Sequence, residues 1–130
     1  MEADPPRYRL FPEGRGFFLD LIHDLQAPLR PHPSVGLYHF ALLLPDRKAL
    51  AGVFRRALEA GVHFEGAADH GVSEALYFCD PEGNGLELYR DRPQGEWPKG
   101  PLMFTAPLSL EKLLAENPKP TPLPPETLLG

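Results

Sequence analysis

Apolar positions recur along this chain at two different periods, which predict several strands and one main helix. Short apolar runs at residues 8–10 and 16–23 flank a Pro-Glu-Gly turn, and this pattern is typical of a β-hairpin. The strongest strand pattern is the run LYHFALLL at residues 37–44. Because this run is apolar on both faces, we expect the strand to be buried on both sides.

A helix is predicted directly after this strand. Apolar residues between positions 50 and 58 follow helical spacing. Asp46 occupies a position that favours an N-cap, and Gly61 occupies a position that favours helix termination. The helix is therefore expected over residues 47–60.

Three further strands are predicted at residues 62–65, 73–79 and 86–90. A polar loop at residues 66–72 separates the first two. The turn sequence DPEGNG at residues 80–85 separates the last two, because proline presets φ while Gly and Asn tolerate positive φ. We expect the last two strands to pair as a hairpin.

The distribution of proline delimits this folded unit. The sequence has 17 prolines, of which Pro45 and Pro81 alone lie within residues 34–92. Proline removes a backbone donor and is rare in helix interiors and central strands, so residues 34–92 hold the order β-α-β-β-β between irregular flanks. A serine-capped helix at residues 110–116 and a proline-rich tail at residues 117–130 are expected after it.

Charge and composition exclude several classes of partner. The 13 basic and 18 acidic residues give a net charge of −5, which provides no general attraction to nucleic acid or to an anionic membrane. No apolar run is long enough to span a bilayer, and a single cysteine excludes both an internal disulfide framework and a cysteine-based zinc site. We therefore expect a cytoplasmic protein that binds neither nucleic acid nor membrane.

Two residues are candidate metal ligands. His39 lies in the middle of an apolar strand, where it is either a core histidine with a satisfied hydrogen bond or a ligand. Glu87 alternates with leucines in the last strand, where it either faces outward or needs a partner. An imidazole nitrogen and a carboxylate oxygen on two strands of one sheet together fit a site for a divalent metal.

Three other polar residues have weaker contexts. His70, in the polar loop, is either solvent-exposed or a general acid/base that works near neutral pH. Tyr77 is either a core or edge tyrosine or a hydrogen-bond partner of an anionic oxygen. Asp20 is a carboxylate in an apolar strand and hence a spare ligand candidate.

Three stretches of these residues resemble a known family. They are GLYHFALL at residues 36–43, DHGVSEALY at residues 69–77, and DPEGNGLELY at residues 80–89, which is followed by DRP. Together they resemble the vicinal oxygen chelate (glyoxalase/bleomycin resistance/extradiol dioxygenase) superfamily, and within it the two-domain bacterial catechol 2,3-dioxygenases. The resemblance covers about residues 8–116.

This resemblance implies an α+β fold in which two βαβββ modules surround a divalent metal. In extradiol enzymes, two histidines and one glutamate hold Fe(II) and leave positions for catechol and O2. By position, His39 and Glu87 are then the metal ligands of one module. His70 is the residue that assists proton transfer, and Tyr77 contacts a catecholate oxygen. The implied substrates are a small aromatic diol and O2.

The chain departs from the family pattern at its N-terminal side. The resemblance implies another histidine ligand from a first module, of which the hairpin is expected to be a remnant. Residues 1–116 are therefore interpreted as one incomplete domain, either a fragment or a chain with a misassigned start. The missing ligand comes from another chain, from Asp20 or His23, or not at all, which would leave the protein inactive.

Two alternative functions remain open. One is a non-catalytic module of the same fold that binds small molecules, and the other is a glyoxalase-type metal-dependent isomerase. A homodimer is expected in each case, because an incomplete module leaves an open sheet edge that proteins rarely leave uncovered.

Overall fold

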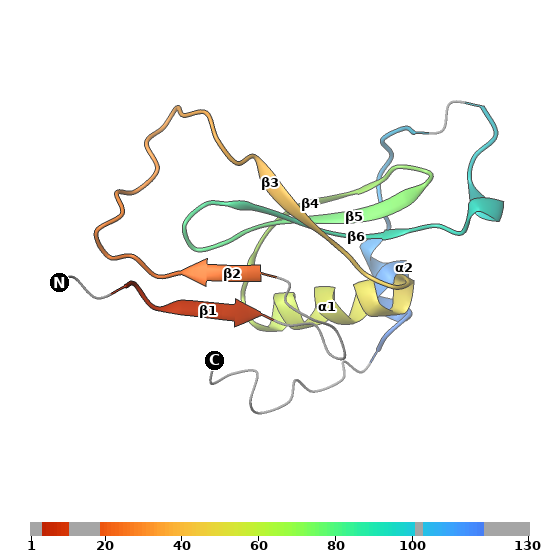
Figure 1. The fold of residues 1–130 in the computed structure, drawn as a ribbon. Coiled ribbons are helices and arrows are strands. Elements are labelled where there is room, and N and C mark those ends of the chain that lie inside the picture. The colour runs from red at the N-terminus through yellow and green to blue at the C-terminus, as the bar shows by residue number, and fades with distance from the viewer. Residues whose placement is uncertain (1–3, 11–18, 101–102, 119–130) are drawn as a thin grey trace. The chain divides into compact units, whose positions relative to one another are not determined.

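A computed structural model describes residues 4–10, 19–100 and 103–118 (Figure 1). The described residues fall into two compact units, one that ends at Ser34 and one that begins at Val35.

The first unit contains a two-stranded antiparallel sheet. Strand β1 (Arg7–Leu10) pairs with β2 (Leu19–Ile22), with Arg9 opposite Asp20. The predicted pairing of these two runs is therefore confirmed. Their turn and the start of the second run, residues 11–18, lie outside the described residues.

The second unit has the predicted order β-α-β-β-β, followed by a short 3₁₀ helix and a second α-helix. The α+β class and the βαβββ module are thus confirmed. In chain order the elements are β3 (His39–Leu43), α1 (Arg47–Glu59), β4 (His63–Asp69), β5 (Ser73–Cys79), β6 (Gly85–Asp91), η1 (Gln94–Glu96) and α2 (Leu110–Ala115). The sheet order is β3-β6-β5-β4, in which β3 runs parallel to β6 and the other pairs are antiparallel.

Side-chain caps set where both helices begin. The Asp46 carboxylate accepts a hydrogen bond of 2.7 Å from the Ala49 amide at the start of α1, and Gly61 follows that helix with a φ of +70°. Ser109 accepts a longer bond from the Lys112 amide at the start of α2. Within the described residues, neither helix combines the length and the apolar composition that crossing a membrane requires.

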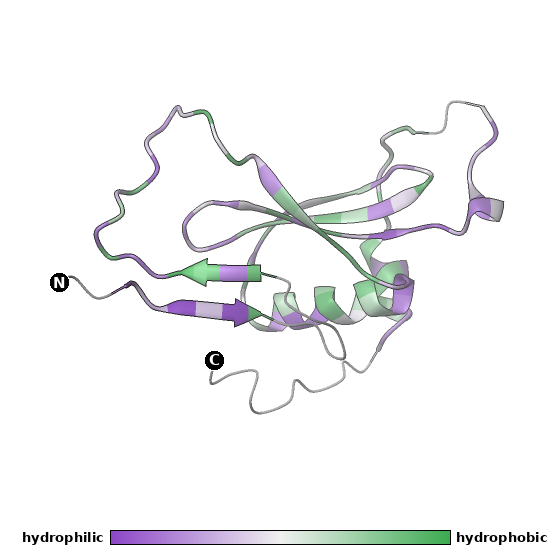
Figure 2. Cartoon of the chain, viewed as in Figure 1, coloured by the Kyte–Doolittle hydropathy of each residue, from purple (hydrophilic) through white to green (hydrophobic). Residues whose placement is uncertain are grey.

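The core lies between the two helices and one face of the sheet. Its buried members come from α1, β5, β6 and α2, and they are Leu50, Ala51, Phe54, Leu76, Phe78, Leu88 and Leu113. Phe64 of β4 adds aromatic contacts, with its ring centroid 5.1 Å from that of Phe54 and 5.4 Å from that of Phe78. Apolar residues accordingly occupy both helices and stretches of the strands (Figure 2). Alternation along the strands places the intervening residues on the opposite face.

The predicted division into a strand at 62–65 and a loop at 66–72 is wrong. Strand β4 continues to Asp69, because its backbone pairs with β5 as far as Asp69 opposite Glu74. A register shift between Phe64 and Gly66 interrupts this ladder and marks a bulge. Gly66, where the loop was expected to begin, therefore lies at an irregularity within a strand.

The predicted burial of the 37–44 run on both sides is also wrong. Strand β3 is an edge strand with β6 as its one partner among the described residues. Leu42 packs against the core, whereas Ala41 is exposed and Leu43 is 57% exposed. One face of this strand is therefore covered by the core, and its other face is exposed.

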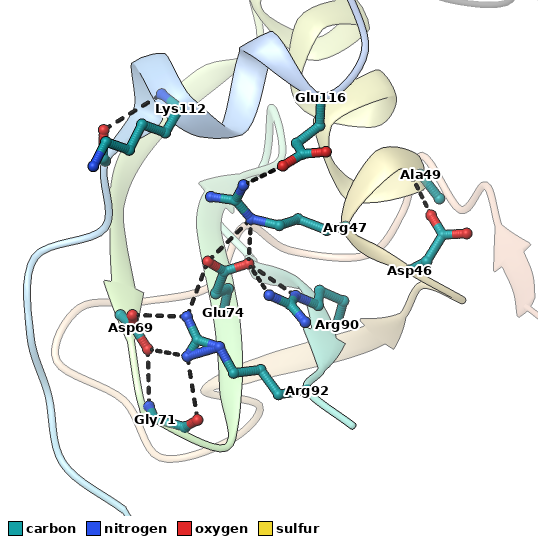
Figure 3. A network of polar contacts seen from close by, with 11 residues as sticks. Asp46, Arg47, Ala49, Asp69, Gly71, Glu74, Arg90, Arg92, Lys112 and Glu116 are labelled. Carbon is teal, nitrogen blue, oxygen red and sulfur yellow. Dashed lines mark hydrogen bonds and ion pairs between the residues drawn. The ribbon is translucent and has the colours of Figure 1, made fainter. Parts of the chain in front are cut away.

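A network of charged side chains lies at the end of the sheet where α1 begins and α2 ends (Figure 3). The Glu74 carboxylate is 2% exposed and accepts hydrogen bonds from Arg90, Arg47 and Arg92. Arg47 also contacts Glu116 at 2.6 Å. Burial alone would raise the pKa of Glu74, but the bonds and positive charges of Arg90 and Arg47 outweigh burial and hold this pKa below its usual 4.5.

This network predicts a specific acid dependence of stability. Because the pKa of Glu74 is lowered in the folded state, its stabilising contribution is present above pH 4.5 and is lost as the pH falls toward the lower folded pKa. We expect Glu74→Gln to lower the free energy of unfolding by about 3 kcal/mol at neutral pH, since it leaves the buried Arg90 without its charged partner. Urea denaturation across the acid range should show a smaller loss of stability in the variant than in the wild type.

Glu59→Gln provides the control, because Glu59 is exposed at the end of α1. This variant should retain the wild-type stability and its acid dependence. Identical pH profiles for Glu74→Gln and the wild type would contradict the assignment.

Candidate active site

The parallel pairing of β3 with β6 brings His39 and Glu87 together. His39 lies opposite Gly85, and Glu87 lies two positions further along the same face of β6. The imidazole Nε2 of His39 is 3.0 Å from the carboxylate Oε2 of Glu87. The two side chains are 34% and 17% exposed, so the pair is partly screened and still open to a small ligand.

This close approach depends on Gly85, which lies directly opposite His39. A Cβ atom on Gly85 would lie 2.6 Å from the carbonyl oxygen of Tyr38 and 2.9 Å from the Cβ of His39. Both distances are too short for a real side chain, so β3 could not run at its present position beside any other residue type. The ring of Tyr38 packs edge-on against that of His39 with their centroids 4.9 Å apart.

His70 and Tyr77 form a second pair. The Nε2 atom of His70 is 3.0 Å from the Tyr77 hydroxyl, and Nδ1 is 2.9 Å from the carbonyl oxygen of Phe104. A carbonyl oxygen only accepts, so Nδ1 carries a hydrogen and donates it. In the neutral ring Nε2 is then the acceptor, and the Tyr77 hydroxyl donates to it.

Cross-strand pairing places the two pairs on one face of the sheet. Tyr77 lies directly opposite Glu87 in the antiparallel ladder of β5 and β6. Burial, and then the negative charge of Glu87 together with Tyr38, raises the pKa of Tyr77 above its usual 10.0. The phenol therefore keeps its proton at neutral pH and remains able to donate it to His70.

The donor set fits a divalent metal in part. Metal–ligand bonds of about 2.1 Å at right angles place two donor atoms about 3 Å apart, which matches the separation of His39 Nε2 and Glu87 Oε2. Within the described residues no group of three or more His, Cys, Asp or Glu side chains could hold a metal ion. The described part of the chain thus brings one imidazole and one carboxylate within reach of a common ion, without a third such side chain beside them.

The other two ligand candidates, Asp20 and His23, lie in the first unit. Asp20 contacts Arg9 across the hairpin, with its Oδ1 3.2 Å from Nε of the arginine. His23 is exposed, and its backbone amide bonds to the Pro6 carbonyl. Sequence analysis missed the Phe104 carbonyl as a partner of His70, because a backbone acceptor leaves no signal in residue type.

Comparison with known proteins identifies the family of this chain. The sequence profile described as the Glyoxalase/Bleomycin resistance protein/Dioxygenase superfamily matches residues 2–88, which is more than half of the chain. The chain belongs to this superfamily. The family resemblance inferred from the three sequence stretches is therefore confirmed.

Two curated members of the superfamily are similar to this chain. The catechol-2,3-dioxygenase of Bacillus subtilis (strain 168) is 43% identical over 125 residues, which cover 91% of this chain and 44% of that protein. The biphenyl-2,3-diol 1,2-dioxygenase 3 of Rhodococcus globerulus is 34% identical over 64 residues, which cover 49% of this chain and 34% of that protein. The chain thus spans less than half the length of either relative.

The close approach at Gly85 predicts the effect of a single methyl group. In Gly85→Ala, the added Cβ must push β3 away from β6, so the His39 ring should leave the Glu87 carboxylate. We expect a loss of about 1–3 kcal/mol in the free energy of unfolding. Urea denaturation measures this loss, and the NMR signals of the His39 ring report the displacement.

Gly66→Ala is the matched control in the same sheet, because a Cβ there would meet nothing within 4 Å. We expect its His39 signals to match those of the wild type. Equal displacement of His39 in both variants, or none in Gly85→Ala, would contradict the role of Gly85.

Proposed function

We propose that the chain provides part of the active site of an iron(II)-dependent extradiol dioxygenase that acts on a catechol-type diol and O2. One observation carries the proposal: two polar pairs, His39 with Glu87 and His70 with Tyr77, lie on the same face of one sheet. In such a reaction a ring carbon–carbon bond next to the diol breaks, and both oxygen atoms of O2 end in the opened product.

His39 and Glu87 are the residues that would hold the metal, either iron(II) or another divalent ion. A neutral imidazole and a carboxylate suit such an ion, and strands fix both donors more rigidly than loops do. When bound, iron(II) would supply a Lewis-acidic, redox-active centre with positions open to both diol oxygens and to O2.

The His70–Tyr77 pair is suited to take the proton that a diol hydroxyl releases on binding. As the Tyr77 oxygen receives this proton, its own hydroxyl proton passes to Nε2 of His70 over their 3.0 Å contact. The resulting imidazolium keeps its Nδ1–H bonded to the Phe104 carbonyl. The ring therefore gains a proton without having to reorient.

The site needs one more protein ligand to complete a facial arrangement. In this proposal His39 and Glu87 supply two, and the third comes from Asp20 or His23, from a residue that the structure does not describe, or from a second polypeptide. The homodimer and the cytoplasmic location expected from the sequence remain predictions.

The two-ligand count also favours a second candidate function. A metal held by one imidazole and one carboxylate is bound more weakly than by a full triad, and a module of this fold without bound metal would serve as a binding protein for small molecules. In that case ligand binding would not depend on His39 or Glu87.

Anaerobic iron loading tests the two ligands. Because His39→Ala and Glu87→Ala each remove one of two donors, we expect the affinity for iron(II) to fall on the order of tenfold or more. His63→Ala is the matched control, since His63 is exposed on β4. Iron content is measured after gel filtration. Equal content in the wild type and in both ligand variants would remove the proposed site.

Turnover tests the proposed reaction in the same preparations. The absorbance of the yellow ring-cleavage product reports the rate, and we expect His70→Ala to keep its iron while kcat falls by about 10²–10⁴-fold. Iron bound by the wild type with no product formed would contradict the dioxygenase proposal.

A further inference from the structure

The turn that carries His70 is held by Arg92, which bonds to the residues on either side of the histidine. The Nη1 and Nη2 atoms of Arg92 donate to Oδ1 and Oδ2 of Asp69 at 2.8 and 2.9 Å, as a two-pronged fork (Figure 3). Oδ1 of Asp69 also accepts the Gly71 amide at 2.9 Å, and Nη1 of Arg92 donates to the Gly71 carbonyl at 3.2 Å. These bonds tie the residues on both sides of His70 to one guanidinium.

The guanidinium is itself held in place from several directions. Its Nη2 donates to the buried carboxylate of Glu74 at 3.1 Å, and Glu74 is fixed in turn by Arg90 and Arg47. The backbone amide of Arg92 donates to the Val72 carbonyl at 2.8 Å. Arg92 therefore belongs to a rigid network and is not a mobile surface side chain.

Asp69 and His70 point to opposite faces of the sheet. Asp69 lies opposite Glu74 in the ladder and points with it toward the helices. The next residue, His70, points its ring to the other face, where Nε2 meets the Tyr77 hydroxyl. A clamp on Asp69 and Gly71 thus sets the direction of the ring through the backbone between them.

A second contact also fixes the orientation of the His70 ring. The Phe104 carbonyl accepts from Nδ1 of His70, and Phe104 belongs to a segment that bridges to Asp69 through paired bonds of 2.8 Å between Asp69 and Ala106. Asp69 is therefore the residue at which the arginine clamp and the carbonyl partner of the ring both attach. A shift of Asp69 would move both ends of the hydrogen-bonded imidazole.

We propose that Arg92 is a positioning residue for His70, and that its bidentate grip on Asp69 holds the imidazole in the orientation and tautomer that accept a proton from Tyr77. The inference rests on the proposed function for the role it gives His70. The geometry on which it stands is independent of any metal.

Ring NMR of the full chain without added metal tests the proposal. The ¹⁵N and ¹H signals of the His70 ring, assigned by their absence in His70→Ala, distinguish a fixed Nδ1–H tautomer from a mobile ring that averages both forms. We expect widely separated nitrogen shifts in the wild type and a collapse toward an averaged value in Arg92→Ala. We expect Arg92→Lys to behave like Arg92→Ala, because an ammonium cannot form the fork.

Arg55→Ala is the matched control. Arg55 makes two hydrogen bonds of 3.1 Å, to the carbonyls of Asn117 and Leu114, and so links α1 to the α2 region away from His70. This variant should lose stability and keep the wild-type ring signals. Unchanged ring signals in folded Arg92→Ala, full retention of the tautomer by Arg92→Lys, or an equal change in Arg55→Ala would each overturn the proposal.

Kinetics provide a second readout if the iron-loaded wild type turns over catechol. Misplacement of the ring should then lower kcat of Arg92→Ala on the order of tenfold or more, with KM and iron content close to wild-type values. Unchanged kcat would overturn the positioning role. Absence of turnover in the wild type would contradict the proposed function alone, and the ring signals would still decide the role of Arg92.

Discussion

The parallel pairing of β3 with β6 is the constraint on which the candidate site depends. A parallel neighbour requires a crossover, and α1 with the β4–β5 hairpin supplies it, so that residues 48 positions apart become neighbours on one face. The pairing is close because Gly85 carries no side chain toward the Tyr38 carbonyl. Without this register the imidazole of His39 and the carboxylate of Glu87 would not meet.

The same sheet separates two kinds of polar chemistry. On the helix side, the Glu74 carboxylate is buried and forms ion pairs with arginines. These ion pairs offset the cost of removing its charge from water. On the opposite side, His39 and Glu87 are paired at 3.0 Å, and both side chains are partly exposed. The turn at residues 69–73 joins the two sides, since Asp69 belongs to the charged network and His70 to the open face. The charged network on the helix side is therefore connected through Asp69 to the residue that carries the imidazole on the other side.

Local signals in the sequence predicted much of this fold. The cap at Asp46, the glycine at position 61 and the alternation over residues 73–79 each act through neighbouring atoms, and the elements they predicted are present. The extent of β4 and the exposure of β3 depend on which strand lies beside each, and residue type does not carry that information. The meeting of His39 and Glu87 was expected from a histidine and a glutamate in two strands of one sheet, and the family resemblance implied the same pair. Glu74 shares a face with Leu76 and Phe78, but its burial among arginines was not predicted, because its partners Arg90, Arg47 and Arg92 follow from tertiary contacts alone.

Paramagnetic broadening by Mn(II) tests the central claim most directly, because it locates a divalent ion without requiring turnover. In the full chain, the account predicts that the NMR signals of His39, Tyr77 and Glu87 broaden at the lowest Mn(II) concentrations and that Glu87→Ala abolishes this pattern. Broadening that centres on the acidic turn at residues 80–84, with the signals of His39 and Glu87 unchanged, would contradict it.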